Sequence, residues 1–181
     1  MSGQAGKYAR FELERRFLVE HLPERKAQDQ GWRITDRYID NTRLRLRRME
    51  PPMGGEAILK LGQKDVPSPP DFSRMTITNI YLSPNEYDVF AVLPARELRK
   101  TRYSLKDANL TYGIDVFEGQ LTGLILAEVG FETSDQMNEQ WRLPPWVLRE
   151  VSDDLRFTGG ALAGLTQDEA TTLIRQLSVK P

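Results

Sequence analysis

A short stretch of alternating charge near the start of the chain constrains its fold more than any other feature. Read as a β-strand, residues 12–19 place Glu12, Glu14 and Arg16 on one face and Leu13, Arg15 and Phe17 on the other. Two carboxylates held side by side repel each other, and their burial is costly unless a cation, an opposing charge or water compensates them. The stretch is therefore either the solvated face of an edge strand or part of a charged cavity.

The same alternation recurs with the opposite sign in residues 42–48. As a strand, this stretch places Arg43, Arg45 and Arg47 on one face and two leucines on the other. Such a strand could lie on a protein surface or bind nucleic acid. An acidic and a basic strand in one small domain allow a third arrangement, in which the sheet closes with its charged faces inward. Carboxylates could then hold a divalent metal while arginines and lysines hold the phosphate oxygens of a polyanion.

Predicted strands outnumber predicted helices and follow one another as hairpins, which favours an antiparallel sheet or barrel with helices outside it. Ser83 and Glu86 form a capping-box pattern around Pro84, which predicts the start of a helix. We expect loops at residues 23–31 and 66–70. The predicted strands cover residues 12–19, 34–40, 43–49, 56–62, 73–82, 97–105, 110–118 and 124–133, and the predicted helices cover residues 84–92, 134–140 and 166–177.

Length and composition narrow the functional classes. The 181 residues suit a single domain spanning residues 1–181. The net charge is −1 although 28% of residues are charged, so no global excess draws the chain to nucleic acid or to an anionic membrane. The chain contains no cysteine, and no stretch approaches the roughly 20 apolar residues needed to span a bilayer. We therefore expect a cytoplasmic protein without a nucleic-acid or membrane partner, in which any polyanion is bound locally.

The acidic run at residues 12–19 resembles the signature Glu-x-Glu-x-Lys of the CYTH domain, the family of triphosphate tunnel metalloenzymes. The similarity continues through residues 43–47, 57–61, 100–103, 115–119, 127–129 and 150–153, in the order and spacing that the family shows. The resemblance implies an α+β, mainly β fold, an antiparallel eight-stranded closed tunnel barrel with flanking helices. It also places the helix at residues 166–177 outside the barrel.

The resemblance implies roles for charged residues that alternate along the strands. Carboxylates would hold Mg²⁺ or Mn²⁺, basic side chains would bind phosphate, and Tyr38 and Lys100 would orient or deprotonate the attacking water. The implied metal ligands are Glu12, Glu14, Asp115 and Glu128, and the implied phosphate-binding residues are Arg16, Arg43, Arg45, Lys60, Arg74, Lys100, Arg102 and Arg156.

Four regions depart from the family pattern. Arg16 replaces the signature lysine, which keeps the charge but changes its shape and reach. Thr76 and Thr78 stand where the family has acidic residues, Gly130 replaces the second acid of a late pair, and Leu155 replaces a lysine. Fewer carboxylates should weaken metal binding and leave much of the basic phosphate site in place.

Three functions fit these observations. The first is metal-dependent hydrolysis of the terminal phosphoanhydride of inorganic triphosphate or a related organic triphosphate, such as a nucleoside or thiamine triphosphate. The second is capture of polyphosphate or triphosphate without turnover, as the missing acids allow. A class IV adenylyl cyclase fits less well, because the segments at residues 100–103 and 115–119 look more like those of bacterial triphosphatases. The sequence also leaves open whether the protein forms a homodimer.

Overall fold

The computed structural model describes residues 9–23, 31–65, 73–138 and 143–178, and of Asp65, Arg74 and Ser178 only the backbone. The loops expected at residues 23–31 and 66–70 lie almost entirely outside this part of the chain. The end of the helix expected at residues 134–140 also lies outside it.

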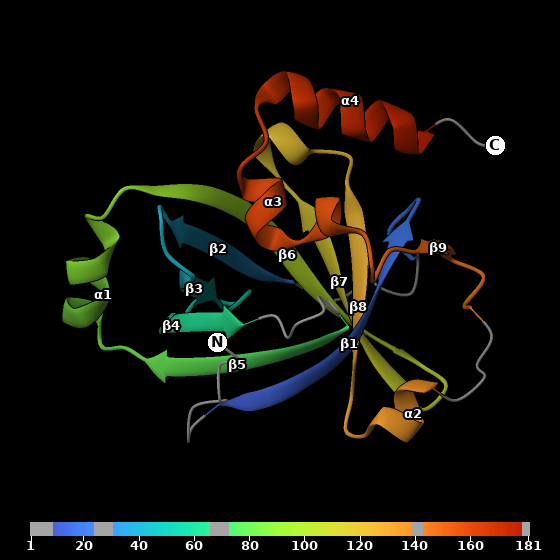
Figure 1. Cartoon of the computed structure of the whole chain (residues 1–181), viewed down its shortest axis with the longest axis horizontal. Coiled ribbons are helices and arrows are strands. Elements are labelled where there is room, and N and C mark those ends of the chain that lie inside the picture. The colour runs from blue at the N-terminus through green and yellow to red at the C-terminus, as the bar shows by residue number, and fades with distance from the viewer. Residues whose placement is uncertain (1–8, 24–30, 66–72, 139–142, 179–181) are drawn as a thin grey trace, which may run out of the picture.

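Nine antiparallel strands form one sheet, and eight of them close into a barrel, which confirms the predicted fold (Figure 1). The strand order is β5-β4-β3-β2-β6-β7-β8-β1-β9, and an additional pairing of β5 with β1 closes the ring. Every pairing is antiparallel. The strands are β1 (Arg10–Val19), β2 (Trp32–Ile39), β3 (Leu44–Glu50), β4 (Ile58–Asp65), β5 (Arg74–Tyr81), β6 (Ala95–Asp107), β7 (Leu110–Phe117), β8 (Ile125–Phe131) and β9 (Val147–Glu150).

The first strand joins the two ends of the barrel sheet. One edge of β1 pairs with β8 through residues 13–18. The opposite edge is divided, because residues 10–13 pair with β5 and residues 17–19 pair with β9. The short strand β9, which was not predicted, therefore continues the sheet where β1 has left β5.

The helices lie outside the ring of strands (Figure 1). They are α1 (Pro84–Ala91), α2 (Ser134–Asn138), α3 (Gly159–Ala163) and α4 (Gln167–Ser178), and two 3₁₀ turns cover Gly119–Leu121 and Leu155–Phe157. The predicted capping box is confirmed at α1, where the Ser83 side chain accepts a hydrogen bond from the Glu86 amide and the Glu86 carboxylate accepts one from the Ser83 amide. In the described part of the chain, α3 is the helix that was not expected.

Apolar side chains pack around the barrel and fill one of its ends. Leu46 packs with Tyr87 beneath α1, and Phe17 packs with Ile114 on the outer face of the strands β1 and β7. A third cluster, which includes Leu162 of α3, fills the end of the barrel beneath α3 and α4. The inner faces are therefore left to charged side chains along the rest of the barrel.

None of the helices in the described part of the chain has both the length and the apolar character needed to cross a lipid bilayer.

Candidate active site: a charged cavity inside the barrel

The inner faces of the strands and the start of α3 enclose a cavity of about 270 Å³. Alternation along the strands brings the acidic face of β1 and the basic face of β3 to this one cavity, although the two strands are not neighbours in the sheet. The cavity is lined by Glu12, Glu14, Arg16, Tyr38, Arg43, Arg45, Arg47, Lys64, Met75, Lys100, Arg102, Glu128, Thr158, Gly159 and Gly160.

Each of the three glutamates that face the cavity is paired with a cation. Glu12 Oε2 lies 2.8 Å from Lys64 Nζ, in an ion pair without hydrogen-bond geometry. Arg16 donates a hydrogen bond of 2.7 Å to Glu14 Oε1 and another of 3.1 Å to Glu128 Oε1. The resting cavity therefore compensates its carboxylates internally.

Two of these glutamates differ in their affinity for protons. Burial, and then the negative charge of Glu128, raise the pKa of Glu14. Burial alone would also raise the pKa of Glu128, but Arg102 and other nearby cations outweigh it and hold that pKa well below its usual value. Glu128 is therefore ionised at neutral pH, and an added positive charge would stabilise the ionised form of Glu14.

Asp115 lies behind the cavity wall and joins two of its cations. Lys100 Nζ donates to Asp115 Oδ2 at 2.6 Å, and Arg102 donates to both carboxylate oxygens at 2.6 and 2.5 Å. Arg102 also donates to Glu128. Asp115 is 1% exposed. Its two oxygens already accept strong bonds, so this geometry suits a residue that orients Lys100 and Arg102 better than it suits a metal ligand.

A second buried aspartate orients the arginines of β3. Arg47 donates to both carboxylate oxygens of Asp36, at 2.6 and 2.7 Å. Arg45 Nε lies 3.7 Å from Asp36 Oδ1 and has no hydrogen-bond partner although the atom is buried. Burial would raise the pKa of Asp36, but Arg47 and Arg45 outweigh it and hold the pKa below its usual range. Arg45 lines the cavity, and its Nε makes only this long ion pair and no hydrogen bond, so its guanidinium keeps a donor that suits an anionic ligand.

The two residues implied in catalysis also face the cavity. Burial lowers the pKa of Lys100, and the charge of Asp115 opposes this effect only in part. Burial, and then the charge of Asp36, raise the pKa of Tyr38, so its hydroxyl is protonated at neutral pH. The phenol can therefore donate a hydrogen bond to a bound anion or orient a water molecule.

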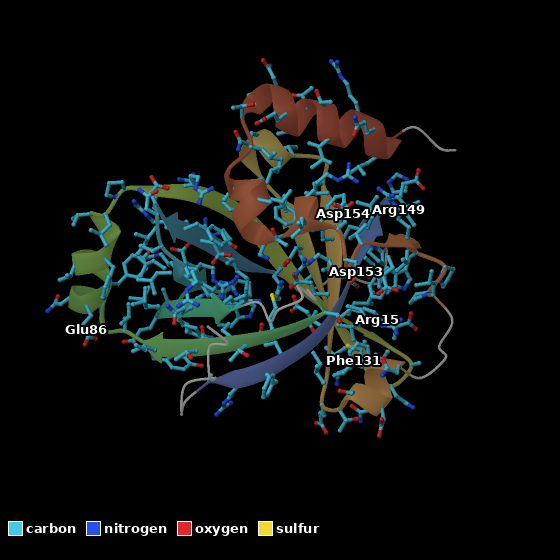
Figure 2. The ribbon with its side chains drawn as sticks, in the orientation of Figure 1. Arg15, Glu86, Phe131, Arg149, Asp153 and Asp154 are labelled. Carbon is cyan, nitrogen blue, oxygen red and sulfur yellow. The ribbon has the colours of Figure 1, made fainter. Side chains whose placement is uncertain are left out.

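Two of the implied phosphate-binding residues, Lys60 and Arg156, do not line this cavity. Lys60 pairs in register with Arg47, but its ammonium lies 4.9 Å from the centre of the Tyr81 ring. Arg156 bonds to Asp154 at 2.6 Å, and its side chain is 57% exposed. Figure 2 shows Asp154 near β9 with Arg149 and Asp153, residues that line a separate surface depression. The side chain of another implied phosphate-binding residue, Arg74, lies outside the described part, so its expected role stays a prediction.

The expectation that Thr76 and Thr78 face the tunnel is wrong. Met75 pairs in register with Glu12, and both line the cavity. Because neighbouring residues of a strand point to opposite faces, Thr76 and Thr78 point to the outer face. Gly62 pairs with Arg45, whose side chain lines the cavity, so Gly62 also belongs to the inner face. A Cβ added at Gly62 would lie 2.8 Å from Asn79 Oδ1, which places Asn79 on the inner face as well and agrees with this register. The inner face of β5 therefore carries Met75 in place of a hydroxyl or an acid.

The other two departures differ in their surroundings. Gly130 pairs with Glu14, so it lies on the inner face, and an added Cβ would meet only the Leu13 carbonyl oxygen, at 3.9 Å. The missing acid therefore leaves open space beside Glu14. Leu155 is 55% exposed and does not line the cavity, so its replacement of a lysine does not change the cavity's charge.

Several residues of the site were not among the predicted ones, and four of them show what the sequence could and could not reveal. Arg47 and Lys64 line the cavity, and alternation along the strands could have predicted both. Arg47 follows Arg45 on the same face of β3, and Lys64 follows the other even-numbered residues on the same face of β4. Asp36 carried no such signal. Gly159 lies more than one hundred residues from its cavity neighbour Tyr38, and local patterning cannot place it.

Whether the cavity suits a divalent cation depends on its donor atoms. Glu12, Glu14 and Glu128 offer only oxygen, which Mg²⁺ and Mn²⁺ prefer, and the buried Glu12 Oε2 accepts no hydrogen bond. As the side chains stand, no three acidic or histidine residues of the described ranges surround one ion position. The residues fit a metal in their chemistry, and binding requires their ion pairs to open.

Comparison with known proteins identifies relatives of this barrel. No family model matches the chain. The inorganic triphosphatase of Nitrosomonas europaea is 31% identical over 159 residues, which cover 84% of this chain and 96% of that protein. A crystal structure of the inorganic triphosphatase NE1496 is 28% identical, covers 86% of this chain and 95% of that one, and has a TM-score of 0.57.

A more distant structure shows the same fold. An adenylate cyclase-like protein of Bacillus halodurans is 16% identical, covers 71% of this chain and 84% of that one, and has a TM-score of 0.50. At this identity the similarity concerns the fold alone. The identity to the Nitrosomonas protein, its nearly complete coverage and the closed barrel together show that the chain belongs to the CYTH family of triphosphate tunnel proteins, as a relative of the inorganic triphosphatases.

Proposed function

We propose that this protein hydrolyses the terminal phosphoanhydride of inorganic triphosphate or a related organic triphosphate, with Mg²⁺ or Mn²⁺ as cofactor. The observation that supports it most is the excess of cations in the cavity, where seven arginines and lysines face three glutamates. The relative with 31% identity is an inorganic triphosphatase. A small cavity with such an excess suits a short, highly charged anion.

The cations differ in how they would bind phosphate. Arg45 has a buried Nε that makes no hydrogen bond, and Asp36 orients Arg47 on the same face of β3. Arg102 is fixed by Asp115 and Glu128. Because these guanidinium groups are oriented before substrate binds, they lose little freedom on binding and can stabilise the charge that develops on the phosphoryl oxygens.

The carboxylates would hold the cofactor. Glu12, Glu14 and Glu128 would bind the ion, which when bound supplies positive charge to the bridging and terminal phosphate oxygens. Opening of the Glu14–Arg16 pair would at the same time release a guanidinium for the substrate. Asp115, predicted as a fourth ligand, acts in this proposal by orienting Lys100 and Arg102.

Lys100 and Tyr38 would act on the attacking water. Because burial lowers the pKa of Lys100, a larger fraction of it is neutral at a given pH than of an exposed lysine, and only the neutral amine can accept a proton from water. Tyr38 keeps its proton and would orient the water or a phosphate oxygen by donating a hydrogen bond. Lys100 is therefore the candidate base, and Tyr38 is the candidate donor.

The direct test is phosphate release by the purified chain. Protein treated with EDTA should be inactive toward tripolyphosphate, and addition of Mg²⁺ or Mn²⁺ should restore release of one phosphate and one pyrophosphate per substrate. The proposal would be refuted if, with either ion, the protein released no phosphate from tripolyphosphate, nucleoside triphosphates or thiamine triphosphate. Formation of cyclic AMP from ATP would favour the cyclase instead.

A second cavity favours organic triphosphates as an alternative substrate class. It has a volume of about 600 Å³, is lined by Trp32, Met49 and Ile58, and shares Arg102 with the charged cavity. An aromatic ring attached to a triphosphate could stack on Trp32 while Arg102 binds the adjoining phosphate. If so, Trp32→Ala should reduce kcat/KM for ATP or thiamine triphosphate and leave that for tripolyphosphate unchanged.

The open space beside Glu14 at Gly130 favours the third candidate, capture of triphosphate or polyphosphate without turnover. Calorimetry that shows tight tripolyphosphate binding without phosphate release would identify this case. The cytoplasmic location, the single domain over residues 1–181, a homodimer, and the absence of nucleic-acid and membrane partners remain predictions from the sequence.

A further inference from the structure

The start of α3 lies directly against the hydroxyl of Tyr38. Gly159 and Gly160 line the charged cavity together with Tyr38. A Cβ atom added at Gly159 would overlap the Tyr38 hydroxyl oxygen and would lie 3.0 Å from Tyr38 Cζ. At Gly160 the nearest atom to an added Cβ would be Tyr38 Cδ1 at 3.7 Å, an ordinary contact. Gly159 does not have a positive φ, so the position requires space and not a special backbone conformation.

The helix α3 and the strand β2 cannot move away from each other without disturbing the core. Leu162 of α3 is fully buried and Phe157, two residues before Gly159, is 1% exposed. Both belong to the apolar cluster that fills this end of the barrel, and Tyr38 packs against the same cluster. The strand that carries Tyr38 is paired on both edges, with β3 and β6. A methyl group at residue 159 would therefore displace the tyrosine side chain sooner than the backbone.

We propose that Gly159 is a positioning residue, which leaves the space occupied by the Tyr38 hydroxyl and thereby holds that hydroxyl beside the phosphate-binding arginines. This inference rests on the proposed role of Tyr38 in hydrolysis. Tyr38 is a protonated donor whose action depends on where its oxygen lies, and Gly159 of α3 lies directly against that oxygen. The inference assigns a function to a helix that sequence patterning did not predict.

The test compares Gly159→Ala in two backgrounds. In the otherwise unchanged protein we expect kcat for tripolyphosphate to fall by about 10- to 100-fold with a smaller change in KM, because displacement of a catalytic group by about 1 Å has effects of this size. In the Tyr38→Phe background, the same substitution should cost less than about 3-fold, because the displaced oxygen is gone. Equal losses in both backgrounds, or no loss in the first, would overturn the inference.

Gly160→Ala is the matched control, since it adds the same methyl group one residue later in the same helix. Gly160 also lines the cavity, but its added Cβ would make only ordinary contacts, so we expect a smaller loss in kcat than for Gly159→Ala. Melting temperatures of all variants will show whether the barrel is intact. A loss for Gly160→Ala as large as that for Gly159→Ala would mean that α3 tolerates no side chain at either position, and would also overturn the inference.

A spectroscopic measurement separates this inference from the proposed function. In protein labelled with ¹³Cζ-tyrosine, the Tyr38 resonance is assigned by its disappearance in Tyr38→Phe. It should shift in Gly159→Ala and stay in place in Gly160→Ala. If the unmodified protein hydrolyses no triphosphate, the proposed function fails, and this shift still decides whether Gly159 positions Tyr38. An unchanged resonance in Gly159→Ala refutes the positioning role whatever the activity.

Discussion

Two buried aspartates give the cavity its order at the scale of single residues. Asp36 and Asp115 do not line the cavity, yet each accepts two or more charge-assisted hydrogen bonds from cations that do. Such bonds are short and directional, so they fix where the cations point before any ligand arrives. Removal of either aspartate should therefore affect both stability and activity.

We expect Asp36→Asn to lower the free energy of unfolding by about 3–5 kcal/mol, because it leaves the buried Arg47 without its counter-charge. Urea denaturation at pH 7 would measure this loss. The low pKa of Asp36 in the folded protein contributes stability that is present above the unfolded-state pKa of about 3.9 and disappears as the pH falls through the lower folded-state pKa. The stability of the asparagine variant should therefore depend less on pH in this acidic range.

Asp40→Asn is the control, because the half-exposed Asp40 pairs with the half-exposed Arg96 at 3.3 Å. Its loss should be between about 0 and 1 kcal/mol. Equal destabilisation by the two substitutions would contradict the structural role of Asp36.

Lys100→Ala should reduce kcat by roughly 10²- to 10⁴-fold if Lys100 is the base. The lowered pKa of Lys100 means that its neutral form becomes populated at a lower pH than in a free lysine, whose pKa is about 10.4. The kcat of the unmodified protein should therefore rise with pH through this lowered value, and the rise should be absent in the variant. Lys106→Ala, at an exposed position of the same strand, is the control, and a rise that persists without Lys100 would exclude it as the base.

At the scale of elements, the local period of the sequence predicted strands, and the resemblance to the family implied that they close into a ring with charged faces inward. Alternation with a period of two separated the two faces of β1, β3 and β6, because strand geometry determines which residues share a face. The family pattern placed the inner face of β5 one residue off, at Thr76 and Thr78 instead of Met75. Neither the period nor the family pattern predicted β9 or α3, whose positions depend on contacts with β1 and Tyr38 from far along the chain.

Ser152 links one of these missed segments to the site. Its Oγ accepts a hydrogen bond of 3.0 Å from the Arg16 amide and donates one of 2.6 Å to Glu150. Ser152→Ala leaves a buried amide without a partner, so we expect a loss of about 1–3 kcal/mol in the free energy of unfolding. Thermal and urea denaturation would measure it, with the exposed Ser104→Ala as control. Equal stability of the two variants would mean that β9 is not held through this bond.

At the scale of the whole molecule, the acids and bases of the cavity neutralise one another before any ligand binds. Each of the three glutamates pairs with a cation of the cavity. Glu12 pairs with Lys64, Glu14 with Arg16 and Glu128 with Arg102. A metal ion that takes the carboxylates frees these cations, and a triphosphate that takes the cations frees the carboxylates. The two ligands should therefore bind cooperatively, and the coupling must be reciprocal.

Calorimetric titration of Mn²⁺ into the Lys100→Ala variant, in which we expect slow turnover, would measure this coupling. We expect tripolyphosphate to tighten Mn²⁺ binding by roughly 5- to 150-fold, the usual range for coupled sites. Added salt should weaken triphosphate binding, because it screens the charges of the cavity. Equal Mn²⁺ affinity with and without tripolyphosphate would contradict the idea that the glutamates and cations of the cavity neutralise one another before a ligand binds.

The divided edge of β1 has a consequence for how the protein can be shortened. A truncated protein that ends after β8 would retain all eight strands of the barrel. It would nevertheless lack β9, the serine that bonds to the Arg16 amide, and the glycine that accommodates the tyrosine hydroxyl. The segment after β8 thus contributes Thr158, Gly159 and Gly160 to the cavity lining, and tags or fusions are better placed beyond α4.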